Sequence, residues 1–409
     1  MGENPVTCAR ISLMSSPPTT LPDSNKWELL PYMTVMAVLS ASIGGIVVVL
    51  GDLRDALGFT DTEIGVVVTA GFLAAFVAQI SLARLADRGH GRVMAIAGIA
   101  ISAVALFGMV FVDSVFGWVT CRALLGFAGG LALPGLRRAA TVLDPANVGE
   151  NVGRLVVGEI SGFLLGPIVA ALFVVGFGIR APFLAFAIGM VIFLPFVMRL
   201  PADRGAIDTS RRSAFGLLKI RRLQGALLVV GGYFMMIGAW ESVMPVMFKD
   251  RGGGALQTGI AFTLLGLPVV FLSPYAGKLA DRLGPPKVAI IGTGLVSLST
   301  MLYGYIPGLV WPVVLMAIFG ISDAFGFTAA QVAVSRAVVE QRQAAALGLM
   351  GAVEVLGAAL LALPAALVYD SHGAGPAWLL AGFSSFALIT LGAIRFRGTE
   401  PASRMPAPH

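Results

Sequence analysis

The chain has 409 residues, of which 57% are hydrophobic and only 12% are charged, and its mean hydropathy is +0.88. A soluble domain carries about 25% charged residues, so this chain has too little polar surface to solvate a globule, and we expect lipid to cover most of it. The net charge of +6 comes from basic residues in short gaps between apolar runs, which excludes a nucleic-acid-binding surface and is typical of membrane-protein loops. The two cysteines, Cys8 and Cys121, can build neither a disulfide framework nor a metal cluster.

Twelve apolar runs follow a tail at residues 1–26 that is rich in Pro, Ser and Thr, and that we expect to be disordered rather than a cleaved signal. Each run is long enough to cross a membrane as a helix, which takes about 20 residues. The runs lie near 31–51, 63–83, 93–112, 115–135, 152–175, 178–199, 224–247, 257–277, 287–306, 311–333, 343–368 and 376–395. The runs at 152–175 and 178–199 nearly touch, which predicts a tight turn around residues 177–180.

The longer gap after the sixth run divides the chain. We expect an all-α membrane protein with an N-terminal six-helix bundle at 27–200, a linker at 201–222, a C-terminal six-helix bundle at 223–396 and a second tail at 397–409. With the N-terminus in the cytoplasm, all but five of the 28 lysines and arginines lie on the cytoplasmic side; the five are Arg54, Arg122, Arg180, Lys249 and Arg251. This bias predicts that both termini are cytoplasmic, in a protein of the cell (inner or plasma) membrane.

The two predicted bundles repeat each other. The sequence "LADR" occurs at Leu85–Arg88 and again 194 residues later, at Leu279–Arg282, each time after the second run of its half. Likewise "GEISGFLLGP" at 158–167 resembles "VEVLGAALLA" at 353–362. Parallel repeats of six helices are found in certain secondary transporters.

The motifs around these repeats resemble those of the major facilitator superfamily. That family's loop between helices two and three follows G-x-L-A-D-R-x-G-R-[KR], and this chain has "ARLADRGHGR" at 83–92 and "GKLADRLGPPK" at 277–287. The fourth run contains "RALLGFAGG" at 122–130, similar to the family's R-x-x-x-G-x-x-x-G element. The resemblance implies two pseudo-symmetric bundles of the major facilitator fold. Within the two loops we interpret five residues as gate elements: Asp87, Arg88, Arg92, Asp281 and Arg282.

The fifth run adds "GFLLGP" at 162–167, which is similar to the G-x-x-x-G-P element of drug-exporting antiporters. Gly158, Gly162 and Gly166 form a flat ridge at spacing i, i+4, i+8, and Pro167 removes one helix hydrogen bond. The resemblance implies that this ridge packs against the other half at the outer end and acts as a gate. Ordinary small-residue helix packing is the alternative.

Five ionisable residues interrupt the runs: Arg122, Glu159, Glu241, Asp323 and Glu354. Each costs about 2.5–3.5 kcal/mol at membrane depth and is therefore a functional candidate. We interpret Glu354, Asp323 and Glu159 as proton-coupling carboxyl groups, with Arg122 as the electrostatic partner that helps one of them to release its proton. The alternatives are a structural pair for Arg122, a water-exposed rim position for Glu159 and an interhelical hydrogen bond for Asp323.

Substrate contacts are predicted in the seventh run, where "YFMMIGAW" at 233–240 precedes Glu241. Methionine and aromatic side chains offer an adaptable surface for lipophilic ligands, so Phe234, Met235, Trp240 and Glu241 are candidate substrate-binding residues. Lipid-facing or core positions for the first three, and an interfacial position for Glu241, are the alternatives.

The predicted function is that of a secondary transporter, because no G-x-x-x-x-G-K-[ST] nucleotide loop occurs in the chain. We expect a proton-coupled exporter, an antiporter of small lipophilic or cationic molecules such as drugs, that works by alternating access as a monomer in the bilayer. It is expected to be no enzyme and to need no cofactor or metal; its partners are protons and a small-molecule substrate. One alternative is a proton symporter that takes up an organic acid or a sugar, and another is a sensor built on the same fold.

Overall fold

The computed structural model describes residues 29–143, 148–200, 214–339 and 342–397. Most of the two predicted tails, and residues 201–213 of the predicted linker, lie outside this part of the chain. The rest of the predicted linker holds a short 3-10 helix, Ala214–Lys219, and the first residues of the seventh long helix, which begins at Arg221.

Within the described ranges the chain is all-helical, as predicted, with twelve α-helices. The first half holds α1 (Leu30–Leu57), α2 (Asp61–Leu85), α3 (Gly91–Phe111), α4 (Val115–Leu143), α5 (Val148–Phe177) and α6 (Ala181–Met198). The second half holds α7 (Arg221–Asp250), α8 (Ala255–Leu283), α9 (Pro285–Thr300), α10 (Val310–Ser335), α11 (Gln343–His372) and α12 (Ala374–Phe396).

Eleven of these helices are long and apolar enough to cross a membrane. The exception is α9, which has 16 residues and ends at Thr300, before the predicted end of its run at 306. The chain beyond Thr300 tightens into turns, with Leu302 N–H donating to Ser299 O at 3.0 Å and Tyr303 N–H donating to Thr300 O at 3.3 Å. Such three-residue spacing closes a helix instead of extending it.

The predicted tight turn between the fifth and sixth spans is confirmed. Helix α5 ends at Phe177 and α6 begins at Ala181. Gly178 lies between them with φ of 93°, a left-handed backbone conformation that glycine adopts without steric penalty.

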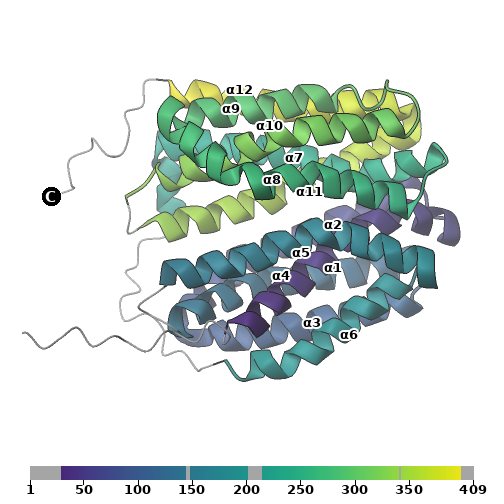
Figure 1. Ribbon diagram of the computed structural model, residues 1–409, viewed down its shortest axis with the longest axis horizontal. Helices are drawn as coiled ribbons and strands as arrows, with labels where there is room; N and C mark the ends of the chain where they lie inside the picture. Colours follow the sequence, from purple (N-terminus) through teal and green to yellow (C-terminus); the bar gives the residue numbers. More distant parts are fainter. Residues whose placement is uncertain (1–28, 144–147, 201–213, 340–341, 398–409) are drawn as a thin grey trace, which may run out of the picture.

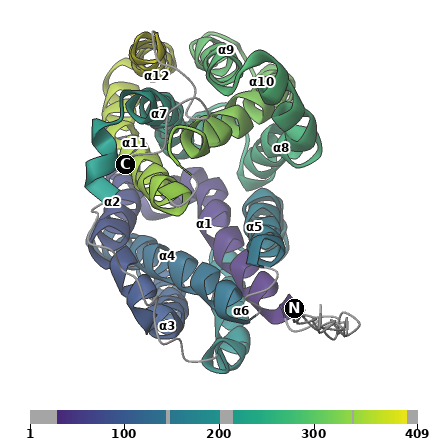
Figure 2. The same ribbon diagram turned by 90° about the vertical axis from the view of Figure 1, so that its left-hand side faces the viewer.

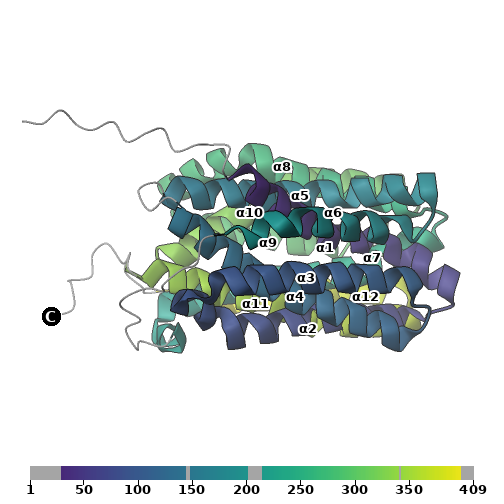
Figure 3. The same cartoon turned by 90° about the horizontal axis from the view of Figure 1, so that it is seen from below.

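The helices run side by side in two groups, α1–α6 and α7–α12, which Figure 1 shows as the lower and upper halves of the molecule. Seen along the helices, the two groups meet where α1, α2 and α5 approach α7, α11 and α8 (Figure 2). The view from below shows the helices running along one common direction (Figure 3). We call one end of this bundle the α1–α2 end and the other the α6–α7 end, after connections that each contains.

The glycine ridge of α5 corrects one expectation from the sequence. An added Cβ at Gly158, Gly162 or Gly166 would overlap the backbone of Met33, Ala37 or Ala41 of α1, which belongs to the same half. The prediction that the ridge packs against the other half is therefore wrong. Glycines spaced by four residues share one helix face, and α1 occupies that face.

Another face of α5 meets the second half. An added Cβ at Gly259 of α8 would lie 2.9 Å from the carbonyl oxygen of Pro167 and from Cβ of Ala171. The hydroxyl of Thr263 donates a hydrogen bond of 3.2 Å to the carbonyl oxygen of Leu164. Pro167 thus lies at the junction of the halves, whereas Gly158, Gly162 and Gly166 pack α5 against α1.

Candidate substrate and ion-coupling site

The five ionisable residues predicted at membrane depth lie at three levels along the bundle. With a rise of about 1.5 Å per residue, Arg122 and Glu241 lie roughly 10–14 Å from the helix ends at the α1–α2 end. By the same measure Asp323 lies about 20 Å from that end, and Glu159 and Glu354 lie about 27 Å from it. The ionisable groups therefore occupy the middle of the bundle, over roughly 17 Å along its axis.

At the first level, an ion pair joins the two halves. Nη2 of Arg122 on α4 lies 3.6 Å from Oε2 of Glu241 on α7, and the two side chains are 3% and 4% exposed. Nε of Arg122 and Oε2 of Glu241 have no hydrogen-bond partner among the described residues. Buried polar atoms are normally satisfied, so this pair keeps free capacity for water, a proton or a ligand.

Helix α2 packs around the guanidinium group of Arg122. An added Cβ at Gly71 would lie 2.9 Å from its Cζ and Nε, and the ring of Phe72 lies with its centroid 5.9 Å from Cζ. Gly126, one turn further along α4, would overlap the backbone of Gly71 if it carried a Cβ. The small residues of "RALLGFAGG" therefore bring α4 against α2 and hold Arg122 in the interior.

At the second level, a carboxyl group meets a cluster of aromatic rings. Asp323 on α10 is 4% exposed, and its carboxyl group interacts with the hydroxyl of Tyr233 on α7. Tyr233 stacks on Phe327 with ring centroids 5.4 Å apart, and Phe234 completes the cluster at 6.0 Å from Phe327. Oδ1 of Asp323 has no hydrogen-bond partner among the described residues. The arrangement combines aromatic faces with an acid whose hydrogen-bonding capacity is partly unused, a combination suited to an aromatic or cationic ligand.

The third level holds charges from both halves. Arg137 of α4 donates a hydrogen bond of 2.6 Å to Oε2 of Glu159 on α5, and these side chains are 46% and 23% exposed. Glu354 of α11 is half-buried and interacts electrostatically with both of them, attracted by Arg137 and repelled by Glu159. Of the two acids related by the internal repeat, Glu159 thus forms an ion pair with Arg137, and Glu354 lies within electrostatic reach of that pair.

Two other predicted substrate residues, Trp240 and Met235, do not form one site with Glu241. Trp240 is fully buried inside the second half, with its ring centroid 6.0 Å from that of Tyr303, which lies 5.3 Å from Trp378. Met235 is half-buried and packs against the hydrophobic core. Trp240 and Glu241 diverge because successive residues on a helix point about 100° apart: Glu241 faces Arg122, and Trp240 faces its own half.

The predicted gate residues lie at the α6–α7 end. Nη2 of Arg336, the residue that follows α10, donates to Oδ1 of Asp281 at 2.5 Å, and Nη2 of Arg92 donates to the carbonyl oxygen of Met198 at 2.6 Å. Arg88 and Arg282 are exposed. The side chain of Asp87 lies outside the part that the structure describes. Both of the bonds above stay within one half.

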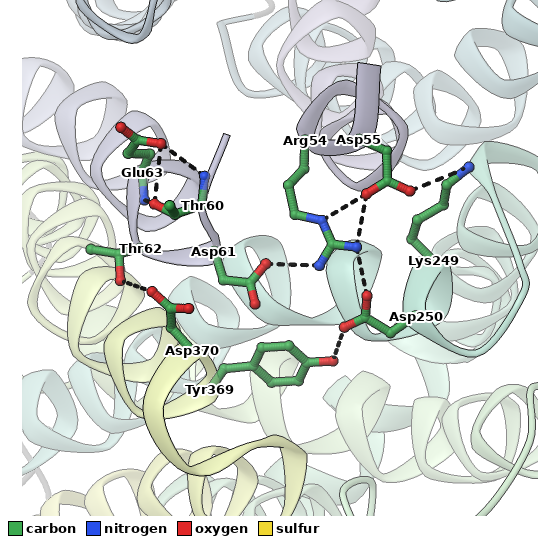
Figure 4. A network of polar contacts seen from close by, with 10 residues as sticks. All are labelled: Arg54, Asp55, Thr60, Asp61, Thr62, Glu63, Lys249, Asp250, Tyr369 and Asp370. Carbon is green, nitrogen blue, oxygen red and sulfur yellow. Dashed lines mark hydrogen bonds and ion pairs between the residues drawn. The ribbon is translucent and has the colours of Figure 1, made fainter. Parts of the chain in front are cut away.

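The α1–α2 end carries a polar network that crosses between the halves (Figure 4). Arg54 of α1 donates hydrogen bonds to Asp61 of α2 at 2.8 Å and to Asp250 of α7 at 2.5 Å, and its Nε donates to Asp55 at 2.9 Å. The hydroxyl of Tyr369 on α11 donates to Asp250 at 2.6 Å. One guanidinium group thus binds three carboxylates from the two halves.

Further bonds support this network. Lys249 donates to Asp52 at 2.6 Å, the backbone N–H of Ala255 donates to the same carboxylate at 2.9 Å, and Thr62 donates to Asp370 at 2.6 Å. Each of these three bonds joins one half to the other. At the α6–α7 end, by contrast, the ion pairs between described residues stay within one half.

Sequence reasoning did not single out several of these residues. Tyr233 lies inside "YFMMIGAW", but that pattern does not show that its ring stacks on Phe327. Arg54 and Lys249 stood out as basic residues on the sparse side of the membrane, and this was the one signal that could have marked the network. Nothing in the sequence pairs them with acids about 200 residues away.

The fold and these buried charges define a class: a polytopic membrane protein with two repeated six-helix halves and ionisable groups at their junction, as in secondary transporters. The family model of the Major Facilitator Superfamily matches residues 32–254 and 227–409. The chain belongs to the major facilitator superfamily, as its motifs predicted.

Curated relatives and solved structures agree with this assignment. The multidrug resistance protein MdtG of Rahnella sp. (strain Y9602) is 26% identical over 308 residues, covering 70% of this chain and 73% of the relative. The protein of the same name from Proteus mirabilis (strain HI4320) is 25% identical over 295 residues, covering 67% and 72%. The crystal structure of the nucleoside transporter NupG matches with a TM-score of 0.71 at 17% identity, covering 91% of this chain and 100% of that one. The crystal structure of a bacterial homologue of the human lysosomal transporter Spinster matches with a TM-score of 0.73 at 15% identity, covering 92% of this chain and 96% of that one. At these identities the two structures establish the fold.

Proposed function

We propose that this protein is a proton-coupled exporter of small lipophilic or cationic molecules, working by alternating access. The observation that carries the proposal is the buried ion pair between Arg122 and Glu241, which joins the two halves at 3.6 Å and in which Nε of Arg122 and Oε2 of Glu241 find no hydrogen-bond partner among the described residues. The two relatives described above are named multidrug resistance proteins, which supports a drug-like substrate.

The coupling follows from the chemistry of the pair. Separating the two halves at this level leaves Arg122 and Glu241 unpaired, and an unpaired buried charge is strongly unfavourable. A proton on Glu241, or a cationic substrate beside it, compensates the carboxylate, and water that enters between the separated halves hydrates the Arg122 guanidinium. Competition between proton and substrate for the same carboxylate gives exchange of one for the other, since a ligand shifts a conformational equilibrium by its differential affinity for the two states.

Asp323 supplies a second binding element. Its carboxyl group, with Tyr233, Phe234 and Phe327, offers charge and aromatic surface for a lipophilic cation. Glu354, Glu159 and Arg137 then form the route for protons at the α6–α7 end, where two carboxylates and one arginine interact.

The cross-half network at the α1–α2 end is the closed gate of this cycle. We place that end on the outer side of the membrane and the α6–α7 end in the cytoplasm, because most basic loop residues belong to the latter. Both termini are then cytoplasmic, the protein lies in the inner membrane as a monomer, and the described state is closed toward the outside. Asp87, Arg88, Arg92, Asp281 and Arg282 belong to the gate at the cytoplasmic end.

The test uses purified protein in liposomes that hold an acidic interior and a pH-sensitive dye. A panel of lipophilic cations, dyes, antibiotics and metabolites is added outside, and proton release is recorded. Export activity predicts that some lipophilic compounds dissipate the gradient through the wild-type protein and through the control Asp113→Asn, whose acid is 62% exposed. Glu241→Gln should abolish that release. Accumulation of a labelled metabolite together with protons, without any response to lipophilic compounds, would instead establish a symporter, and no transport of either kind would favour a sensor.

A further inference from the structure

A groove lies on α8, away from the junction of the halves. It has a volume of about 260 Å³ and is lined by Tyr275, Lys278, Leu279 and Arg282. Their spacing of i, i+3, i+4 and i+7 places all four side chains on one face of the last turns of the helix. The groove belongs to neither the buried charges nor the cross-half network.

This face points away from the other half. Helix α8 meets α5 through residues that include Gly259, Thr263 and Gly266. At 3.6 residues per turn, these residues lie about 140° around the helix axis from the groove. On the groove side, the exposed residues Leu267 and Phe271 are 39% and 65% exposed and lead along α8 to Tyr275, which is 63% exposed. In a membrane protein such an exposed apolar track faces lipid.

Two cations at the end of this track lack a carboxylate partner. Lys278 and Arg282 are exposed, and between described residues neither forms an ion pair; the adjacent acid, Asp281, is bound by Arg336 at 2.5 Å. Nζ of Lys278 lies 5.9 Å from the ring centroid of Tyr275. A free pair of cations, a tyrosine and an apolar track therefore follow one another along one face.

We propose that this groove binds an anionic phospholipid, with the headgroup phosphate between Lys278 and Arg282 and an acyl chain along Phe271 and Leu267. Basic residues at the end of a transmembrane helix attract the anionic lipids of the cytoplasmic leaflet, and tyrosine is favoured at the level of the headgroups. The site rests on the cytoplasmic placement of the α6–α7 end. It does not depend on which substrate is transported.

The test places a reporter on the track. A Phe271→Trp variant of the full chain is reconstituted in phosphatidylcholine vesicles that contain brominated phosphatidylglycerol or, at the same mole fraction, brominated phosphatidylcholine. The fluorescence of the corresponding protein without the reporter is subtracted, because the chain has five native tryptophans. The expected result is several-fold stronger quenching by the brominated phosphatidylglycerol.

Charge removal then identifies the site. Adding Lys278→Gln or Arg282→Gln should each lower the preference for phosphatidylglycerol by up to about five-fold, whereas Lys287→Gln, an exposed cation outside the groove, should leave it unchanged. Unaltered quenching by brominated phosphatidylcholine verifies that each variant is inserted and folded.

Equal quenching by the two lipids in the starting protein, or an equal loss in the Lys287→Gln control, would overturn the proposal. Abolition of the preference by millimolar inorganic phosphate would overturn it as well and reveal a free-anion site. Transport assays play no part, so failure here leaves the proposed function standing.

Discussion

Arg122 and Glu241 face each other across the junction of the two halves, with Nη2 and Oε2 3.6 Å apart. One lies on α4 and the other on α7, 119 positions later in the chain, and both are almost completely buried. A charge pair in this position couples the relative movement of the halves to the binding of a proton or a charged ligand that compensates one of the two charges. It is the relationship from which most of the proposed cycle follows.

The first prediction concerns the stability of this pair. Glu241→Gln leaves the Arg122 guanidinium buried without a counter-charge, and breaking a buried ion pair in this way costs about 3–5 kcal/mol in soluble proteins. We expect a clear fall in the melting temperature and loss of substrate-driven proton release. The double variant Arg122→Met, Glu241→Met should recover most of the melting temperature without recovering proton release. Scanning fluorimetry and the liposome assay measure the two effects; recovery of both would assign the pair a purely structural role.

The second prediction separates charge from aromatic contact in the Asp323 cluster. Asp323→Asn should weaken the binding of a lipophilic cation by about ten-fold or more, because hydrogen bonds and contacts to a charged group are worth about 1.5–3 kcal/mol. Binding of a neutral analogue of the same shape should change little. Tyr233→Phe preserves the stacking on Phe327 and should have a smaller effect. Equilibrium binding of a fluorescent cation and its neutral analogue checks this, and an equal loss for both ligands would contradict a charge-based role.

The third prediction tests the glycine ridge. Gly162→Ala would drive a methyl group into the backbone of Ala37, and overpacking of this kind costs about 1–3 kcal/mol, so the melting temperature in one detergent should fall. Gly176→Ala is the matched control on the same helix, since an added Cβ there meets nothing within 4 Å. Glycine is a poor helix former relative to alanine, so the control should be neutral or slightly more stable. Equal melting temperatures for the two variants would show that α1 yields to the methyl group.

The fourth prediction concerns the gate at the α1–α2 end. Arg54→Gln removes the cation that binds Asp55, Asp61 and Asp250, and the repulsion among the remaining carboxylates should favour separation of the halves at this end. Electron–electron resonance between spin labels at the exposed positions 56 and 372, with Cys8 and Cys121 replaced by serine, should show a larger population at long distances.

Arg180→Gln provides the control for that experiment. Arg180 lies at the same end of the bundle and binds Asp113 at 2.5 Å, but both residues belong to the first half. Its removal should leave the distance distribution unchanged. A shift of the same size in both variants would mean that loss of any surface charge, and not loss of the cross-half network, opens this end.

Much of the architecture follows from local properties of the sequence. Hydrophobic length decides where a helix can cross lipid, and the runs therefore located all twelve helices, including the tight turn between α5 and α6. The run ending at 306 was wrong at its end because apolar character continues through Met301–Ile306 while the backbone already turns. Hydropathy records composition, and it carries no information about the hydrogen bonds that close a helix.

The helix that packs on the glycine ridge of α5 could not be predicted from the sequence. Its spacing showed that three glycines share a face and that a helix comes close to them. Whether that helix belongs to the same half or the other depends on the rotation of α5 about its axis, which is set by all of its neighbours together. The sequence indicated a close contact, and the tertiary structure chose α1.

By itself, the sequence determined the class of protein, the twelve helices, the repeat and the short set of charges that lie in the membrane, because each of these depends on the free energy of placing individual residues in lipid or water. Only the tertiary structure decided the partners. Arg122 with Glu241, Asp323 with Tyr233, and Arg54 with Asp250 come from helices far apart in the chain. Their pairing depends on how helices rotate and pack against one another, and that is a property of the whole bundle.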